Sequence, residues 1–199
     1  MARPHPVDIA PPDLSGWAAS PTGVPYVHER ASGVPGPEVL LTALVHGNEY
    51  AGALALDAFL RSGVAPRCGR ITAAFCNVAA FAQFDPRTPD ASRFVNEDFN
   101  RVWSPDVLDG PRTSAELQRA RAIRPLVERA THLLDLHSMH EPCAPLLVTG
   151  TLPRNIAFAQ ALGTGGQAIV DAGHADGVRV RDYGSFGNAA GNRIALLLE

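Results

Sequence analysis

The chain has 199 residues, of which 46% are hydrophobic and 19% are charged, and its formal net charge at pH 7 is −3. This composition is typical of a globular protein, and the weak negative charge gives no reason to expect a nucleic acid or an acidic membrane surface as a partner. All 17 of its Lys and Arg residues are arginine, so chemistry that forms a Schiff base on lysine is excluded. Three cysteines without paired spacing argue against a disulfide framework or a thiolate zinc site.

The beginning of the chain and its hydrophobic segments give no sign of export or membrane insertion. The first residues are rich in proline and charge where a signal peptide has an apolar core, and no apolar run approaches the ~20 residues of a membrane-spanning helix. We therefore expect a cytoplasmic protein without membrane contact. Residues 1–36 are expected to form an N-terminal arm and a first strand, and residues 37–199 one folded domain.

The first half of the chain predicts alternating strands and helices. A short strand is expected within residues 25–32, and the continuously apolar residues 38–45 predict a strand that is covered on both faces. Residues 49–61 are compatible with a helix that Gly63 would end, and residues 70–78 predict a second buried strand.

Residues 79–111 lack sustained periodicity, and a loop of this length inside a compact domain is usually functional. A helix follows, for which Thr113 and Glu116 predict a capping box. One apolar face is expected on this helix, formed by Leu117, Ala120, Ile123, Val127 and Ala130.

The rest of the chain predicts more strands and one more helix. Strands are expected at residues 132–137 and 145–150, a short helix at 153–163, and a last strand at 193–199. The order strand, helix, strand, loop, helix, strand is typical of an α/β sandwich, in which helices cover both faces of a sheet.

Three of the predicted strands end on polar side chains, namely His46, His137 and Glu199. Ligands bind beyond the carboxyl ends of the strands in open α/β sheets. The turn from His46 to Glu49 would bring an imidazole at a strand end and a carboxylate in the first turn of the following helix to one point. Two nitrogens and one carboxylate form a known ligand set for a catalytic zinc ion. Asp135 points to the same side of its strand as His137 and is a candidate to orient that imidazole.

Other interpretations of these residues remain open at this point. A histidine followed three positions later by a glutamate arises by chance in roughly one sequence in three of this composition. A histidine that ends a strand is also commonly a surface residue. His140 and His174 are alternative ligands, although His140 better suits capping or hydrogen-bonding a loop.

The long loop contains cations and an amide that suit an anionic ligand. Arg93, Asn100 and Arg101 lie within nine residues of one another. A guanidinium can bind a carboxylate through two parallel hydrogen bonds, or stabilise an oxyanion as it develops. The alternative is a solvated loop in which Glu97 and Asp98 pair with the two arginines.

Three motifs follow one another along the chain: HGNE-x-x-G at 46–52, R-x4-D-F-N-R at 93–101 and DLH at 135–137. Together, and with the intervals up to Glu199, they resemble the succinylglutamate desuccinylase and aspartoacylase family of the zinc-carboxypeptidase superfamily. The resemblance implies a zinc-carboxypeptidase-like fold, which is a three-layer α/β sandwich around a mixed, mostly parallel twisted sheet.

The resemblance also implies an enzyme that uses one zinc ion. The ligands of Zn²⁺ would be His46, Glu49 and His137. The implied reaction is hydrolysis of an amide bond in a small, carboxylate-bearing N-acyl amino acid or a related compound, by water that the metal activates. The expected partner is therefore a small molecule and not a nucleic acid, and the oligomeric state stays open.

Roles for four further residues follow from the same resemblance. Arg93 would polarise the scissile carbonyl and stabilise the tetrahedral oxyanion, and Asn100 and Arg101 would bind the carboxylate of the substrate. Glu199 would act as general base and then as general acid.

The chain departs from the family in ways that leave the substrate open. Phe99 stands where the family motif commonly has leucine, and Tyr183 and Arg193 do not lie at the intervals of the family's substrate-binding tyrosine and arginine. Family members generally continue into a C-terminal β-rich domain, whereas this chain ends on an apolar strand, so we expect a fragment of a longer protein. The alternatives are a zinc carboxypeptidase acting on peptides, or a truncated domain that binds metal or ligand without turnover.

Overall fold

The structure, a computed structural model, describes residues 7–163 and 166–199. In this part of the chain seven strands form one sheet with the order β1-β3-β2-β4-β7-β5-β6. They are β1 (Val27–Ala31), β2 (Glu38–Ala43), β3 (Arg70–Phe75), β4 (His132–Leu136), β5 (Leu146–Val148), β6 (Gln167–Ile169) and β7 (Ile194–Leu198). Strands β3, β2, β4 and β7 are parallel, whereas β1 and β5 are antiparallel to β3 and β7, and β6 is parallel to β5. The predicted α/β fold with a mixed, mostly parallel sheet is confirmed.

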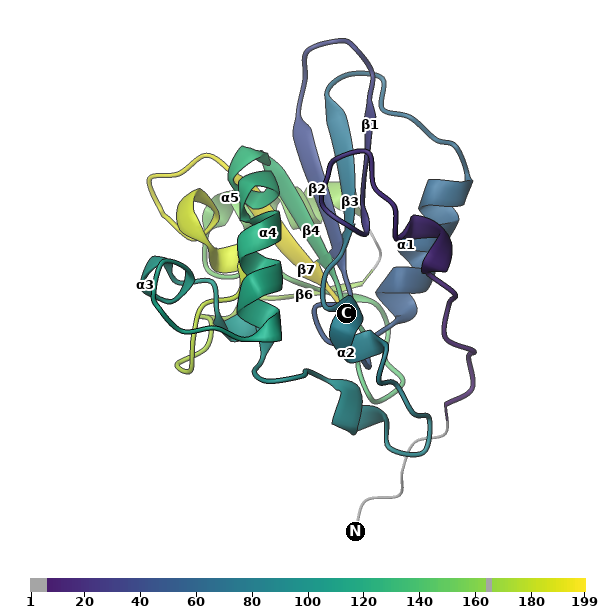
Figure 1. Cartoon of the computed structure of the whole chain (residues 1–199). Helices are drawn as coiled ribbons and strands as arrows, with labels where there is room; N and C mark the ends of the chain where they lie inside the picture. The colour runs from purple at the N-terminus through teal and green to yellow at the C-terminus, as the bar shows by residue number, and fades with distance from the viewer. Residues whose placement is uncertain (1–6, 164–165) are drawn as a thin grey trace.

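Helices cover both faces of the sheet, which gives the molecule three layers; α1 and α4 lie on opposite sides in Figure 1. One face carries α4 (Ala115–Arg129), and the other carries α1 (Ala51–Arg61) and α5 (Pro153–Leu162). Strand β2 illustrates the division, because Leu40 packs in the cluster with α4 while Leu41 packs in the cluster with α1.

The apolar face predicted for α4 is confirmed, since Leu117, Ala120, Ile123, Val127 and Ala130 are all buried in one cluster with the sheet. The predicted capping box is wrong. The N-cap is Ser114, whose hydroxyl accepts a hydrogen bond from the backbone N–H of Leu117. Glu116 does not reach back to the start of the helix, because its buried carboxylate is bonded to the long loop instead. Thr113 and Ser114 are adjacent and both suit an N-cap, so the pattern leaves the helix start uncertain by one position.

The predicted loop at residues 79–111 is irregular over most of its length, but short helices interrupt it. These are α2 (Val78–Phe81), η2 (Pro89–Ser92), η3 (Phe99–Arg101) and α3 (Pro105–Leu108). Phe99 and Trp103 are fully buried, with ring centroids 5.7 Å apart. These two aromatic residues therefore anchor the loop to the core within the D-F-N-R motif and just after it.

Several predicted elements have different bounds in the structure, and two of these changes lie beside His46. β2 ends at Ala43, because Leu44 has a left-handed backbone conformation (φ +57°) that turns the chain out of the sheet. α1 begins at Ala51, so Glu49 lies in the turn before the helix and not in its first turn.

Some elements leave no clear pattern in the sequence. They are β6 and the 3-10 helices η1 (Ser15–Trp17), η4 (Val180–Asp182) and η5 (Gly184–Phe186). All three residues of β6 are exposed, so they show no alternation of apolar and polar side chains. None of the helices in the described ranges combines the length and the apolar character that crossing a membrane requires.

The described part of the N-terminal arm lies along α1. Leu14 is buried there, and the Tyr50 hydroxyl donates a hydrogen bond to the carbonyl oxygen of Ile9 at 2.6 Å. Nε1 of Trp17 donates to Asp57 of the same helix at 2.7 Å. The arm then leads into β1, which forms one edge of the sheet.

Candidate metal centre

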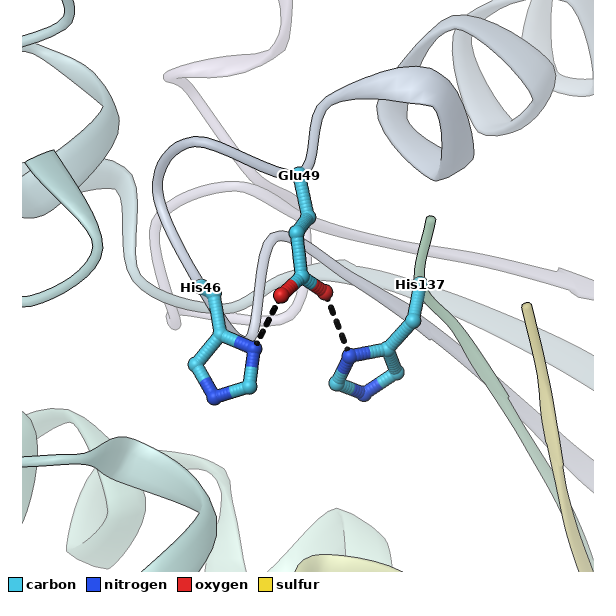
Figure 2. A group of neighbouring side chains, drawn as sticks. All are labelled: His46, Glu49 and His137. Atoms are coloured by element: carbon cyan, nitrogen blue, oxygen red, sulfur yellow. Dashed lines mark hydrogen bonds and ion pairs between the residues drawn. The ribbon is translucent and has the colours of Figure 1, made fainter. Parts of the chain in front are cut away.

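Three side chains converge beyond the carboxyl ends of β2 and β4. Each oxygen of the Glu49 carboxylate faces the Nδ1 atom of one imidazole: Oε1 lies 2.8 Å from His46 and Oε2 lies 2.7 Å from His137 (Figure 2). All three residues are buried, and one ligand atom from each lies within 4.8 Å of the other two. Two imidazole nitrogens and a carboxylate oxygen at these separations can hold a metal ion.

The glycines of the HGNE-x-x-G motif allow the turn and the helix to pack closely. A Cβ on Gly47 would lie 2.3 Å from the carbonyl oxygen of Ser92, and the Gly47 N–H donates to the carbonyl oxygen of Arg93 at 3.0 Å. A Cβ on Gly52 would lie 2.6 Å from the Cβ of Leu136, the last residue of β4. Only glycine fits at either position, so the motif fixes the turn against both the long loop and the strand that leads to the second histidine.

A carboxylate lies behind each imidazole. Nε2 of His137 is 2.8 Å from Oδ2 of Asp135, and Nε2 of His46 is 3.0 Å from Oδ1 of Asp98. Burial favours the neutral form of His137, but the charge of Asp135 and the hydrogen bonds to Asp135 and Glu49 raise the pKa of His137 well above its usual value. The surrounding carboxylates therefore favour a positive charge at this point, which both a proton and a metal ion can supply.

Arg93 reaches the same centre from the long loop. Its Nη1 donates to Oε1 of Glu49 at 2.8 Å, and its Nη2 lies 3.0 Å from Nε2 of His46. Burial opposes the charge of Glu49, but the hydrogen bonds and charges of His137 and His46 outweigh it and lower the pKa of Glu49. The carboxylate therefore stays ionised, as a metal ligand must.

Asn100 and Arg101 follow on the same loop. Asn100 is buried, and its Oδ1 accepts a hydrogen bond from the backbone N–H of Val180 at 2.9 Å, which orients the amide. Arg101 donates to the carbonyl oxygen of Asn100 at 2.9 Å, and its nearest carboxylate is that of Asp98 at 3.9 Å. Most of the donors of Arg101 are therefore available to a ligand.

Two acidic residues support the site in ways that the sequence patterns do not predict. Asp98 lies closer to His46 than to Arg93 or Arg101. Burial opposes the negative charge of Asp98, but the hydrogen bond and charge of His46 outweigh it and lower the pKa of Asp98 to about 2. Glu116 accepts hydrogen bonds from backbone N–H groups of the loop. In the sequence, only the D-F-N-R motif points to Asp98. Glu116 lies near a helix start, where a glutamate suits a capping box, so its contacts with the loop could not be predicted.

Glu199 lies next to the last strand, where its backbone N–H donates to the carbonyl oxygen of Leu146 at 2.9 Å. Its Oε2 is buried without a hydrogen-bond partner among the described residues. Burial raises the pKa of Glu199, and the negative charges of Glu49 and Asp135 add to this rise against the opposing charge of His137. A carboxylate in this state is a stronger base than one in water.

A cavity of about 290 Å³ brings the predicted site residues together. Every one of them except Asp135 lines it. The cavity is also lined by Val148, Ile169, Asp171, His174, Arg179 and Leu197. The space beside the three candidate ligands therefore has a basic wall from the long loop and a second wall from the strands β5, β6 and β7 and the segment after β6.

The sequence model of the succinylglutamate desuccinylase/aspartoacylase catalytic domain matches residues 35–187. The chain belongs to this family. No curated protein matches the sequence significantly.

Solved structures of the desuccinylase/aspartoacylase family share the fold. The succinylglutamate desuccinylase from Chromobacterium violaceum has 20% identity and a TM-score of 0.65, over 88% of this chain and 59% of that chain. An aspartoacylase family protein from Mesorhizobium loti has 21% identity and a TM-score of 0.63, over 87% and 54%. Murine aminoacylase 3 has 20% identity and a TM-score of 0.59, over 83% and 55%. The chain thus spans little more than half the length of these structures.

The other residues that the sequence offers lie outside the cluster of three. His140, an alternative ligand, is exposed on the surface, 3.1 Å from Asp90. His174, the second alternative ligand, lines the cavity but is not among the clustered ligand atoms. The hydroxyl of Tyr183 is bonded to α4, and the guanidinium of Arg193 lies 5.8 Å from the ring centroid of a phenylalanine. These two side chains therefore serve the packing of the fold.

Proposed function

We propose that the chain is a zinc-dependent hydrolase that cleaves the amide bond of a small, carboxylate-bearing N-acyl amino acid or a related compound. The observation that carries this proposal is the convergence of His46, Glu49 and His137 at the wall of a cavity that also contains free guanidinium N–H groups and a buried carboxylate. Nitrogen, nitrogen and carboxylate oxygen is a donor set that zinc accepts, and it leaves room for water or substrate.

The proposed chemistry divides between the metal and Glu199. Zinc bound at this donor set would supply a Lewis acid that lowers the pKa of a water molecule. Glu199 removes a proton from the attacking water and returns it to the departing amine. The raised pKa of Glu199 supports both roles, because the group that accepts the proton must also be able to release it as an acid.

The long loop binds and orients the substrate in this proposal. Arg93 stabilises the negative charge that develops on the carbonyl oxygen, and its contact with Glu49 holds it beside the ligands. Asn100 and Arg101 bind the carboxylate of the amino-acid part. The few carboxylate contacts of Arg101 support this assignment.

The proposal is tested by hydrolysis of a panel of N-acyl amino acids, with the purified chain before and after treatment with a chelator. We expect release of the free amino acid, its loss after metal removal, and its recovery when Zn²⁺ is added back. Peptides with a free C-terminus are assayed in parallel. Faster release of C-terminal residues from peptides would favour a carboxypeptidase, and absence of all hydrolysis from the zinc-loaded chain would contradict the proposal.

A further inference from the structure

The cavity wall that is formed by the strands β5, β6 and β7 and the segment after β6 contains an arginine whose charge two carboxylates neutralise. Nε of Arg179 donates to Asp182 at 2.6 Å, and Nη1 and Nη2 donate to the two oxygens of Asp171 at 2.6 and 3.2 Å. All three nitrogens of the guanidinium are therefore bonded to carboxylates. Three of its five N–H groups are used in this way and only 4% of Arg179 is exposed, so two carboxylates already balance its charge before any further anion binds.

A second buried arginine completes the same network. Arg181 donates from Nη1 to the carbonyl oxygen of Val148 at 2.9 Å, and its Nη2 lies 2.9 Å from Asp182. Burial opposes the charge of Asp171, but the hydrogen bonds of Arg179 and the charges of Arg179 and Arg181 lower the pKa of Asp171. Two positive and two negative side chains therefore cancel, and the wall has no net charge.

Four further residues that line the cavity are uncharged. Val148, Ile169 and Leu197 are apolar. Burial and the nearby positive charges of Arg101 and Arg179 lower the pKa of His174, so its imidazole is neutral at pH 7. A carboxylate placed against these residues would gain from them no cation whose charge is not already balanced.

The arginines of the long loop differ from Arg179, because one of them is available. Arg93 is held by Glu49 at 2.8 Å, whereas the closest carboxylate to Arg101 is 3.9 Å away. Among the described residues that line the cavity, Arg101 is the arginine without a carboxylate at hydrogen-bonding distance. The cavity therefore has one free guanidinium for an anionic group, and its apolar residues Val148, Ile169 and Leu197 suit an uncharged one.

We propose that the cavity selects substrates with a single carboxylate, bound at Arg101, and an uncharged acyl group that lies against Val148, Ile169 and Leu197. Asp171 determines this specificity, because it occupies the guanidinium of Arg179. The inference rests on the proposed hydrolase function. In the reaction the acyl–nitrogen bond breaks, water supplies hydroxyl to the acyl carbon, and its remaining proton goes to the amine.

The test compares two acyl groups that differ only at their end. Butyryl and succinyl groups both have four carbons, but succinyl ends in a carboxylate where butyryl ends in a methyl group. On the same amino acid, we expect the wild-type chain to hydrolyse the butyryl compound with kcat/KM at least about tenfold higher. Asp171→Asn removes one negative charge beside Arg179 and should shift this ratio toward the succinyl compound by at least about tenfold.

Asp176→Asn is the matched control. Asp176 is exposed on the same segment and does not line the cavity, so this variant removes the same charge and should leave the ratio unchanged. An Asp171→Asn variant that folds and keeps the wild-type ratio would overturn the inference, as would a wild-type chain that prefers the succinyl compound.

Two further measurements separate this inference from the hydrolase proposal and from loss of folding. Calorimetric titration of the same two compounds reports their binding preference even if neither is hydrolysed, and equal or reversed affinities in the wild type would contradict the inference alone. Arg179→Gln removes the guanidinium that binds both oxygens of Asp171 and leaves only Arg181, 3.7 Å away, as a cation partner. It should improve binding of the 4-aminobutyryl compound relative to butyryl, because the less neutralised carboxylate then attracts an ammonium group; no gain would count against the role of Asp171.

Discussion

The carboxylate of Glu116 accepts a hydrogen bond from the backbone N–H of Val95 at 2.7 Å, across 21 positions of the sequence. The same carboxylate accepts from the N–H groups of Asn96 and Glu97 at 3.1 and 3.4 Å, and from the side-chain amide of Asn77 at 3.0 Å. Glu116 is fully buried and does not line the cavity. It therefore fixes the backbone of the long loop between Arg93 and the D-F-N-R motif without touching a ligand.

Glu116→Gln is expected to weaken substrate binding from this distance. The amide has one acceptor oxygen in place of two, so buried N–H groups lose their partner, and we expect a loss of about 2–3 kcal/mol in the free energy of unfolding. KM for carboxylate substrates should rise while the metal content stays unchanged. Urea unfolding, steady-state kinetics and elemental analysis measure the three quantities. Glu97→Gln, which removes a partly exposed ion pair with Arg112, is the control and should change each much less.

The contacts of Glu116 show where sequence patterns stop being informative. The apolar face of α4 could be predicted because its residues recur at the helical period. This period relates residues only three or four positions apart in the sequence. The bonds of Glu116 join it to residues 19 to 39 positions away. A glutamate in the first turn of a helix is also what a capping box requires, so the local pattern predicts the wrong partner.

The candidate site likewise contains residues that could be predicted from the sequence and contacts that could not. His46, His137 and Glu199 could be grouped from the sequence because parallel strands bring their carboxyl ends to one edge of the sheet. The pairing of Asp171 with Arg179 could not, since both lie in an irregular segment after a strand that has no sequence signature. Helices and strands with a regular apolar period are predictable, whereas ion pairs within an irregular segment depend on the completed fold.

His46→Ala is expected to abolish stable metal binding. The substitution removes one of three donor atoms that lie within 4.8 Å of one another and leaves a cavity beside two carboxylates. Elemental analysis after dialysis against a weak chelator should show the metal retained by the wild type and lost from the variant. His140→Ala is the control, because His140 is exposed and lies outside the cluster. Equal metal content in both variants would remove His46 from the ligand set.

Asp135→Asn is expected to reduce metal affinity by about 10- to 100-fold. Asp135 is fully buried between the Thr42 hydroxyl at 2.7 Å and Nε2 of His137 at 2.8 Å, so it orients the imidazole with Nδ1 toward Glu49. The asparagine amide keeps the shape of the Asp135 carboxylate but lacks its negative charge, which favours a cation at the candidate metal centre. Competition with a metal-binding dye measures the affinity. The surface variant Asp57→Asn should bind as the wild type does, and an unchanged affinity for Asp135→Asn would exclude this supporting role.

Glu199→Gln is expected to keep the metal and to lower kcat by at least about 100-fold, because a glutamine can neither accept nor return the proton of water. Glu199 lies outside the three clustered ligands, so metal content should equal that of the wild type. The pH dependence gives an independent check. Burial raises the pKa of Glu199 above its usual 4.5, and the base must be ionised to work, so kcat/KM of the wild type should fall as pH drops through a value above 4.5. A variant that retains its rate, or a wild-type profile that stays flat down to pH 4.5, would assign the proton transfer to another group.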